Sequence, residues 1–409
     1  MHSRVLRSIL AASLSWLLSA CASNPAVGPG DGNGTAPPGT GTGAAHDAGN
    51  NTGGHDAGGG TGSPPAHEAG PAQGGATTGA PYHVQGAQIL DRNNQPHLFR
   101  GLDRPSLEWS CSGDIVETDY ITMAQMWKAN VVRLPLNQDC WLQDASNPSA
   151  DSSYQALVDE QVQWAKTYNM DIILDLHWSD RGDYSVGQTC LTANGNCQQD
   201  MADAHSVTFW DQVAAKYKNE PQVLFELYNE PKIGGYSPQP ANWDTWLNGG
   251  QSSGFTVHGM QELYTHVRNA GANNLVIVGG LSWSFDLSGL SSHALNGTNI
   301  VYNTHVYDMN PANEWFSKFG TFAGTYPIIA TEFGDHSGSC STGVVTNFTS
   351  YANGNAVGGS SAPANKLSWT AWAFYAPQSS PCTFPALIGG DGTPTAAGLV
   401  VQKALTNGP

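Results

Sequence analysis

Short apolar runs alternate with stretches of helical period along the chain from residue 81 onward. Runs of this length that are apolar at nearly every position are typical of buried parallel strands. Eight runs, each followed by a segment that can form a helix, predict an α/β fold, the (β/α)₈ TIM barrel. The runs span residues 97–102, 130–136, 170–177, 222–229, 275–279, 300–307, 327–333 and 367–374.

The segments between the runs carry the spacing of amphipathic helices. Residues 153–168 and 255–270 place their apolar side chains on one side of a helix, and residues 286–295 form a weaker helical pattern. Ahead of the first run, residues 81–96 predict a β-hairpin that covers the floor of the barrel, with a turn at residues 93–96.

The N-terminal part differs from the rest of the chain in composition. Residues 1–20 have a basic start, a short apolar stretch and small residues before a cysteine, which is the pattern of a secretory signal peptide. The ending resembles a bacterial lipobox, so we expect Cys21 to be lipidated; an ordinary signal peptide that contains a cysteine is the alternative. Residues 21–80 predict a disordered linker, because from residue 24 onward their only Val, Ile, Leu or Met is Val27, and they contain no aromatic residue.

These features predict an exported protein, either an outer-membrane lipoprotein or a cell-surface or extracellular one. A lipid anchor would tie it to the membrane, and residues 81–409 would form its folded domain. The formal net charge of -17 argues against nucleic acid as a partner.

The seven cysteines fit an oxidising compartment. Apart from Cys21, six remain, and the barrel prediction places them in loops that follow neighbouring strands, or in one shared loop. We therefore predict the disulfides Cys111–Cys140, Cys190–Cys197 and Cys340–Cys382. Metal ligation is the rival interpretation, but the spacings match no zinc module.

Two of the apolar runs end in a glutamate. The run at 223–230 ends in Asn229-Glu230 before a proline, and the run at 327–333 carries Glu332 before a glycine. A buried strand does not normally end in a carboxylate unless its tip faces something polar. In a barrel the C-terminal strand ends meet at one mouth, so both glutamates would lie there. Paired carboxylates at one site are the groups that cleave glycosidic bonds.

Other predicted strands also end in polar or aromatic side chains, and this ordered set resembles glycoside hydrolase family 5, within the clan of retaining (β/α)₈ glycosidases. The resemblance extends from residue 97 to about residue 375, and residues 101–109 are similar to the opening of bacterial endoglucanases, or cellulases, of this family. The residues that carry it are Arg133, His177, Asn229, Glu230, His305, Tyr307, Glu332 and Trp372.

The resemblance implies a role for each of these residues. Glu230 would be the acid/base and Glu332 the nucleophile of a retaining, two-step hydrolysis. Arg133 and Tyr307 would keep Glu332 charged. The resemblance further implies that Asn229 binds the sugar 2-hydroxyl, that His177 and His305 bind hydroxyls or orient the carboxylates, and that Trp372 stacks beneath the sugar. It implies no cofactor and no metal.

Further aromatic residues fall on predicted loops at the barrel mouth, and indole rings stack well on the apolar faces of β-linked sugars. Trp283 and then Trp178 are the best candidates for substrate contacts; core packing is the alternative for each ring. The complete set is Trp109, Trp141, Trp178, Tyr184, Trp283 and Trp315.

Aromatics on several loops predict endo-action on a β-linked polysaccharide. A β-1,4-glucan such as cellulose is the first expectation for the substrate. Mannan, xyloglucan and mixed-linkage glucan stay open, since no residue separates glucose from mannose. A barrel that binds carbohydrate at the cell surface without catalysis is the alternative from a different class, and the two glutamates argue against it.

Overall fold

A computed structural model describes residues 82–142, 153–179, 198–252, 254–377, 382 and 384–407 of this protein. All of these residues belong to one unit, Ala69–Pro409. The predicted signal peptide, lipidation site and most of the predicted linker lie outside the described residues. No described helix is both long and apolar enough to cross a bilayer.

Eight parallel strands close into a barrel, as the apolar runs predict. Each predicted run overlaps one strand, and the strands follow the order β10-β11-β12-β3-β4-β5-β6-β9 around the barrel. The (β/α)₈ prediction is therefore confirmed. The strands are β3 (Arg100–Asp103), β4 (Val131–Asn137), β5 (Asp171–Trp178), β6 (Val223–Glu226), β9 (Val276–Gly279), β10 (Ile300–Val306), β11 (Ile328–Phe333) and β12 (Ser368–Ala371).

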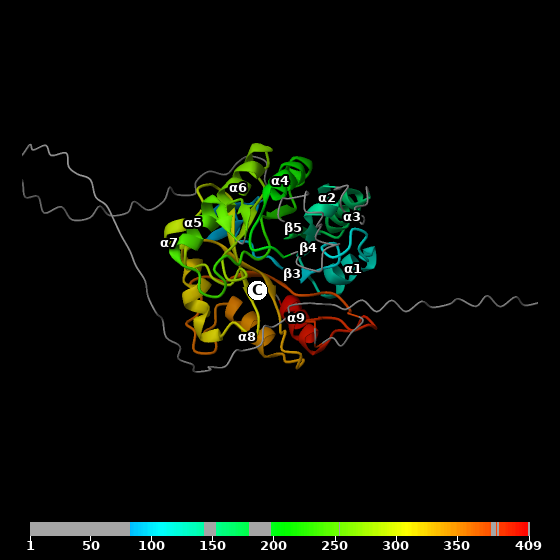
Figure 1. Ribbon diagram of the computed structural model, residues 1–409. Helices are drawn as coiled ribbons and strands as arrows, with labels where there is room; N and C mark the ends of the chain where they lie inside the picture. The colour runs from blue at the N-terminus through cyan, green and yellow to red at the C-terminus, as the bar shows by residue number, and fades with distance from the viewer. Residues whose placement is uncertain are drawn as a thin grey trace, which may run out of the picture. The chain divides into compact units, whose positions relative to one another are not determined.

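Helices surround the strands (Figure 1). The α-helices are α1 (Glu117–Ile121), α2 (Gln138–Leu142), α3 (Tyr154–Thr167), α4 (Ala204–Tyr217), α5 (Pro240–Asn248), α6 (Met260–Asn269), α7 (Leu290–His293), α8 (Gly343–Ala352) and α9 (Ala396–Thr406). Local sequence explains where α4 begins. The Asp203 carboxylate accepts hydrogen bonds from the backbone of His205 and Ser206, while the Ser206 hydroxyl accepts one from the Asp203 backbone, which satisfies amides that the first turn leaves open.

Single-turn helices complete the connections: η1 (Thr122–Met126), η3 (Ala312–Glu314), η4 (Phe316–Gly320) and η5 (Phe322–Gly324). The prediction of a helix over 255–270 is wrong in its first part. Phe255–Val257 forms the strand β8, paired with β7 (Gly250–Ser252), and its side chains alternate between buried and exposed. The helix α6 starts only after Gly259. The weak pattern at 286–295 yields just the short helix α7.

A β-hairpin covers the barrel floor, as predicted, but its turn lies elsewhere. Its strands are β1 (His83–Gln85) and β2 (Gln88–Leu90), so the chain reverses at Gly86, whose φ of +57° suits glycine. The predicted turn residues form a second turn, in which the Asp91 carboxylate accepts hydrogen bonds from the backbone amides of Asn93 and Gln95.

The hairpin closes an apolar layer, the floor, that fills the lower interior of the barrel. Its side chains are all buried and exclude water from the N-terminal ends of the strands. The floor consists of Val84, Ile89, Phe99, Val131, Ile173, Leu224, Leu275, Ile277, Val301 and Ile329.

Two of the three predicted disulfides are present. Cys111 pairs with Cys140 at a Cα–Cα distance of 5.3 Å, and Cys340 pairs with Cys382 at 4.6 Å. Both distances lie in the usual range for disulfides. The third predicted pair, Cys190–Cys197, lies outside the described residues.

Candidate active site

All eight residues of the predicted site gather at the C-terminal ends of the strands, the barrel mouth. They come from six strands or from the residues shortly after them: Arg133 from β4, His177 from β5, Asn229 and Glu230 after β6, His305 and Tyr307 from and after β10, Glu332 from β11, and Trp372 after β12. The register between β10 and β11 shifts between Thr304 and His305, and this shift sets His305 opposite Glu332.

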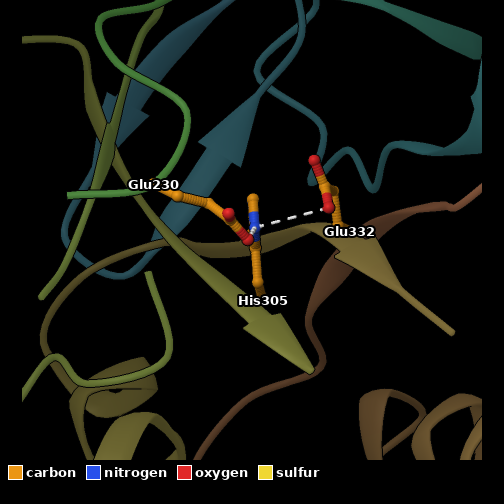
Figure 2. A group of neighbouring side chains, drawn as sticks. All are labelled: Glu230, His305 and Glu332. Atoms are coloured by element: carbon orange, nitrogen blue, oxygen red, sulfur yellow. Dashed lines mark hydrogen bonds and ion pairs between the residues drawn. The ribbon is translucent and has the colours of Figure 1, made fainter. Parts of the chain in front are cut away.

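The two glutamates face each other across His305 (Figure 2). A carboxylate oxygen of Glu230, a ring nitrogen of His305 and a carboxylate oxygen of Glu332 all lie within 4.8 Å of one another. The Nδ1 atom of His305 is 3.0 Å from Glu230 Oε1 and 3.6 Å from Glu332 Oε2. The Glu230 side chain is 14% exposed and that of Glu332 is 5% exposed, so Glu230 lies nearer to solvent.

Glu332 is held in its ionised form. Arg133 Nη1 donates a hydrogen bond to Glu332 Oε1 at 2.7 Å, and the Tyr307 hydroxyl donates one to Oε2. Burial alone would raise the pKa of Glu332, but the charges of His305 and Arg133 and the Tyr307 hydrogen bond hold it at about 2. This carboxylate is therefore ready to act as a nucleophile at neutral pH.

Arg133 is the centre of a buried charge cluster that the sequence reasoning missed. Its guanidinium lies 3.1 Å from Asp103, 2.9 Å from Asp175 and 2.7 Å from Glu226, besides its contact with Glu332. Burial raises the pKa of Asp175 to about 7, against the pull of the Arg133 charge. Each carboxylate interrupts or ends an apolar run, which is the signal by which the sequence could have revealed it.

His177 is neutral and fixed in orientation. Burial lowers the pKa of His177 to about 4, and its Nδ1 atom lies 2.7 Å from Asp175 Oδ2, so Nδ1 carries the proton. Nε2 then faces the Asn229 amide nitrogen at 3.4 Å, while Asn229 Oδ1 accepts a hydrogen bond from Arg133. The ring also stacks on Trp372, with centroids 5.6 Å apart.

Trp283 lies beside the chain segment that follows Glu230. It packs against Tyr236 with the two ring planes tilted by 30° and their centroids 4.5 Å apart, and Lys232 Nζ lies 6.0 Å from the ring centroid. The backbone φ of Trp283 is +55°, a left-handed conformation that side chains rarely adopt. Hydrogen bonds to the residues around Glu230 hold this turn: Trp283 N donates to Pro231 O, and the Ser284 hydroxyl donates to Asn229 O.

The other predicted mouth aromatics separate into two groups. Trp178 and Trp109 are part-exposed, and Trp109 packs edge-on against Tyr375. By contrast, the prediction that Trp141 and Trp315 line the mouth is wrong, because they are only 1% and 2% exposed and pack in the core between helices and barrel. Tyr184 lies outside the described residues.

A family model, Cellulase (glycosyl hydrolase family 5), matches residues 90–377. The chain belongs to glycoside hydrolase family 5. Among curated proteins it is similar to an endoglucanase of Clostridium saccharobutylicum, 25% identical over 81% of this chain and 66% of the relative. It is also similar to an endoglucanase of Thermobifida fusca, 22% identical over 61% of this chain and 47% of the relative. The chain thus spans about half to two thirds of the length of these relatives.

Solved structures of family 5 enzymes share the fold. A β-glucanase from Saccharophagus degradans aligns with a TM-score of 0.58 and 23% identity, over 81% of this chain and 94% of that one. The catalytic domain of a Thermobifida fusca endoglucanase in complex with cellotetraose aligns with a TM-score of 0.56 and 18% identity, over 80% and 98% of the two chains. At these identities the likeness establishes the barrel fold alone.

One group of atoms at this family 5 site has the spacing of a metal site: Glu230, His305 and Glu332. We assign no metal to it, because positive charge is already in place. Arg133 contacts Glu332 directly, and although burial lowers the pKa of His305, the negative charges of Glu332 and Glu230 raise it above its ordinary value. A raised pKa favours the protonated imidazole, whose nitrogens have no lone pair for a metal.

Proposed function

We propose that this protein is a retaining endo-β-1,4-glucanase, in which Glu230 is the acid/base and Glu332 the nucleophile. The observation that carries the proposal is the separation of the two carboxylates, whose nearest ligand atoms lie within 4.8 Å. Retaining glycosidases hold their carboxyl groups about 5–5.5 Å apart, whereas inverting enzymes need about 6.5–9.5 Å to admit a water.

In the first step, the ionised Glu332 attacks the anomeric carbon. As the carbon–oxygen bond to Glu332 forms, the glycosidic bond breaks and its electron pair moves to the leaving oxygen, which takes a proton from Glu230. Arg133 and Tyr307 hold Glu332 in place for this attack, because each donates a hydrogen bond to a different oxygen of the carboxylate.

In the second step, the same groups reverse their roles. Glu230, now a carboxylate, accepts a proton from water as the water oxygen attacks the anomeric carbon, and the bond to Glu332 breaks. The product keeps the configuration of the substrate because the carbon is attacked twice from opposite sides. The Glu332 carboxylate recovers its negative charge beside Arg133.

The remaining site residues bind the sugar in this proposal. The Asn229 amide is held by Arg133 and can meet the 2-hydroxyl, a contact that tightens in the transition state. Trp372 and His177 stack on each other beside the carboxylates and form one wall of the sugar site. Trp283, with Tyr236, forms an aromatic surface on the side of Glu230, and Trp178 is a further candidate contact.

A β-1,4-glucan is the proposed substrate, and cleavage within the polymer is the proposed mode of action. The curated relatives named above are endoglucanases, which supports glucan over mannan. An endo-β-mannanase, or a hydrolase of another β-glycan, is the second candidate, because the aromatic surfaces suit any β-linked chain. The paired carboxylates argue against a barrel that only binds carbohydrate.

The test is incubation of the protein with carboxymethyl-cellulose, β-mannan, xylan and barley β-glucan. Hydrolysis is measured by the release of reducing sugar and by the loss of viscosity. We expect a fast drop in viscosity on carboxymethyl-cellulose. Glu332→Ala and Glu230→Ala should each lose at least about a thousandfold in kcat while staying folded by circular dichroism. Azide should partly rescue Glu332→Ala, since it replaces the lost nucleophile.

Activity on mannan alone would keep the mechanism and move the substrate. Near-normal rates in both glutamate variants would overturn the assignment of the two catalytic groups. A folded wild-type protein that binds but hydrolyses none of the four polymers would favour the binding-only alternative.

We further propose that the enzyme is exported and anchored by a lipid at Cys21, with residues 21–80 as a tether for the barrel. The support is the composition of the sequence alone. Incorporation of labelled palmitate into the wild type but not into Cys21→Ala would be the expected result. Equal labelling of the two proteins would refute the lipid anchor.

A further inference from the structure

Glu226 lies beneath the catalytic pair and accepts hydrogen bonds on both of its oxygens. Its Oε1 atom accepts from Asn303 Nδ2 at 2.8 Å, from Thr331 Oγ1 at 2.7 Å and from Arg133 Nη2 at 3.3 Å. Its Oε2 atom accepts from Arg133 Nε at 2.7 Å. Burial raises the pKa of Glu226 above its ordinary value, but so many converging donors match an ionised carboxylate, which can only accept.

The groups around Glu226 fix the direction of the hydrogen bond between Thr331 and Glu226, and the first of these groups is the Asn303 side chain. Asn303 Oδ1 accepts a hydrogen bond from the Thr331 backbone amide at 2.9 Å, so its Nδ2 atom must be the one that faces Glu226. The Thr331 backbone amide and the Arg133 guanidinium can only donate, and an ionised Glu226 carboxylate has no hydrogen to donate to Thr331. The single hydroxyl hydrogen of Thr331 therefore points to Glu226.

This leaves the lone pairs of Thr331 Oγ1 free to accept. His305 Nε2 lies 3.0 Å away, on the side of the ring opposite Glu230. Because Thr331 has already given its hydrogen to Glu226, the contact is a hydrogen bond only if His305 Nε2 carries a proton. The Nδ1 atom then faces Glu230 Oε1 at 3.0 Å (Figure 2).

We infer that Glu226 and Thr331 are positioning residues for catalysis, which fix the Nε2-protonated form of His305 and so make its Nδ1 atom the proton partner of Glu230. This inference rests on the proposed function. With Nε2 protonated, Nδ1 accepts the hydrogen of a protonated Glu230, or shares one with the Glu230 carboxylate when the ring is cationic. The pair thus holds the one proton that moves to the leaving oxygen as the glycosidic bond breaks.

Loss of the Thr331 hydroxyl should make the His305–Glu230 pair lose its catalytic proton at lower pH. Without an acceptor, a hydrogen on Nε2 would be buried and unsatisfied. A neutral ring would avoid this by carrying its hydrogen on Nδ1, where it donates to ionised Glu230. The form of the His305–Glu230 pair that lacks the catalytic proton is then favoured. The alkaline limb of the profile of kcat/KM against pH should therefore move to lower pH.

Several charged or titratable groups interact with His305 and would complicate a test that changed any of them. They are Glu226 on β6, Glu230 after it, Glu332 on β11, Arg133 on β4, and Asp175 and His177 on β5. Thr331 is uncharged, and replacing it by valine or serine leaves all six in place. Thr331→Val removes the hydroxyl at nearly constant volume, and Thr331→Ser is the matched control that keeps it.

The experiment compares kcat/KM across pH for two substrates. Cellotetraose has a poor leaving group that needs the acid, whereas 2,4-dinitrophenyl β-cellobioside has a leaving group that does not. For Thr331→Val we expect the alkaline limb on cellotetraose to fall by about one pH unit, the value of one buried hydrogen bond. The rate on cellotetraose should drop about tenfold, with little change on the dinitrophenyl substrate.

Thr331→Ser should keep the wild-type limb and the wild-type ratio between the two substrates. An unmoved limb in Thr331→Val, with equal losses on both substrates, would overturn the inference, because a merely structural defect acts on both alike. A serine variant that behaves like the valine variant would also overturn it, since the hydroxyl would then have no special part.

Nitrogen NMR of the His305 ring tests the same point in the wild-type protein and does not require the valine variant to fold. Comparison with His305→Asn identifies the signals, and spectra are recorded above the pH at which the ring loses its second proton. We expect the hydrogen on Nε2; a hydrogen on Nδ1 would overturn the inference. Failure of the wild type to hydrolyse any β-glycan would instead overturn the proposed function, while the ring state still decides this inference.

Discussion

The floor and the mouth of the barrel are built on the same strands but hold their side chains by different forces. On five strands an apolar residue of the floor is followed, two positions later, by a polar residue that also points into the barrel. The pairs are Val131 and Arg133, Ile173 and Asp175, Leu224 and Glu226, Val301 and Asn303, and Ile329 and Thr331. All ten side chains are buried, so burial alone does not distinguish the two layers.

The difference lies in what burial does to each layer. In the floor it removes apolar surface from water, which stabilises the fold without further conditions. In the mouth it desolvates charges, which destabilises them unless partners are present. Arg133 is the common partner of the four carboxylates with which it forms ion pairs. The mouth is therefore stable only as a complete set, which also fixes Glu332 and Asn229 in position for the proposed catalysis.

Removal of the central cation should have the largest effect. Arg133→Met leaves Asp103, Asp175 and Glu226 buried without their counter-charge, and we expect the free energy of unfolding to fall by about 3–5 kcal/mol at pH 8, with loss of activity. Urea unfolding measures the change. Loss of Arg133 raises the pKa of these carboxyls in the folded protein further above their pKa in the unfolded chain. A carboxyl whose pKa is raised by folding stabilises the folded protein less and less as pH rises. The loss should therefore be smaller at pH 5 than at pH 8.

Arg133→Lys is the matched control, because it keeps one positive charge but not the planar fork of donors. It should recover part of the stability without recovering activity. If Arg133→Met unfolds at the same urea concentration as the wild type at pH 8, the mouth does not depend on its charge balance.

A floor substitution on the same strand as Glu226 should affect stability alone. Leu224 is buried in the floor, and Leu224→Ala should lower the free energy of unfolding by about 2–5 kcal/mol through lost apolar contact and a new cavity. We expect kcat/KM and the pH profile of the folded fraction to stay close to those of the wild type. Leu224→Met, which nearly conserves volume, should cost less than about 1.5 kcal/mol. A fall in kcat/KM as steep as that of Arg133→Met would show that the two layers are not separable.

The sequence predicts the two layers unequally. The strands and the position of the two glutamates at the barrel mouth can be predicted, because apolar runs that end in a carboxylate before Pro231 or Gly334 are visible within one segment. The partners of Arg133 cannot, since periodicity shows that Asp175 or Glu226 lies on a buried strand but not which residues meet across the closed barrel. That information resides in strand order and register, such as the shift that brings His305 opposite Glu332.

The aromatic residues show the same limit. Trp283 and Trp141 both lie after predicted strands, yet Trp283 is held beside the segment after Glu230 by a left-handed turn, and Trp141 lies in the core against Phe209. The early start predicted for the helix at 255–270 fails for a related reason. Apolar residues at 255 and 257 fit both a helix and a strand, and only pairing with β7 decides between them.

The smallest effect, and the sharpest test of the mouth, concerns a single hydroxyl. Tyr307 donates to Glu332, and Tyr307→Phe removes this hydrogen bond while His305, Arg133 and His177 remain. The pKa of Glu332 should rise from about 2 but stay below its ordinary value. Because the nucleophile must be ionised, the acid limb of kcat/KM should move to higher pH by up to about one unit.

Tyr228→Phe provides the control, because Tyr228 is also buried at this end of the barrel but its hydroxyl donates to the backbone oxygen of Gln199, not to a carboxylate. Its acid limb should stay where it is in the wild type. The depressed pKa of Glu332 also stabilises the fold above the pKa of about 4.3 that an unfolded glutamate has, and this contribution is lost as pH falls toward 2. Tyr307→Phe should therefore be destabilised relative to the wild type at pH 7 and less so at pH 3. A limb that does not move, or one that moves equally in both tyrosine variants, would mean that the Tyr307 hydroxyl does not set the charge of Glu332, and that Arg133 and His305 suffice.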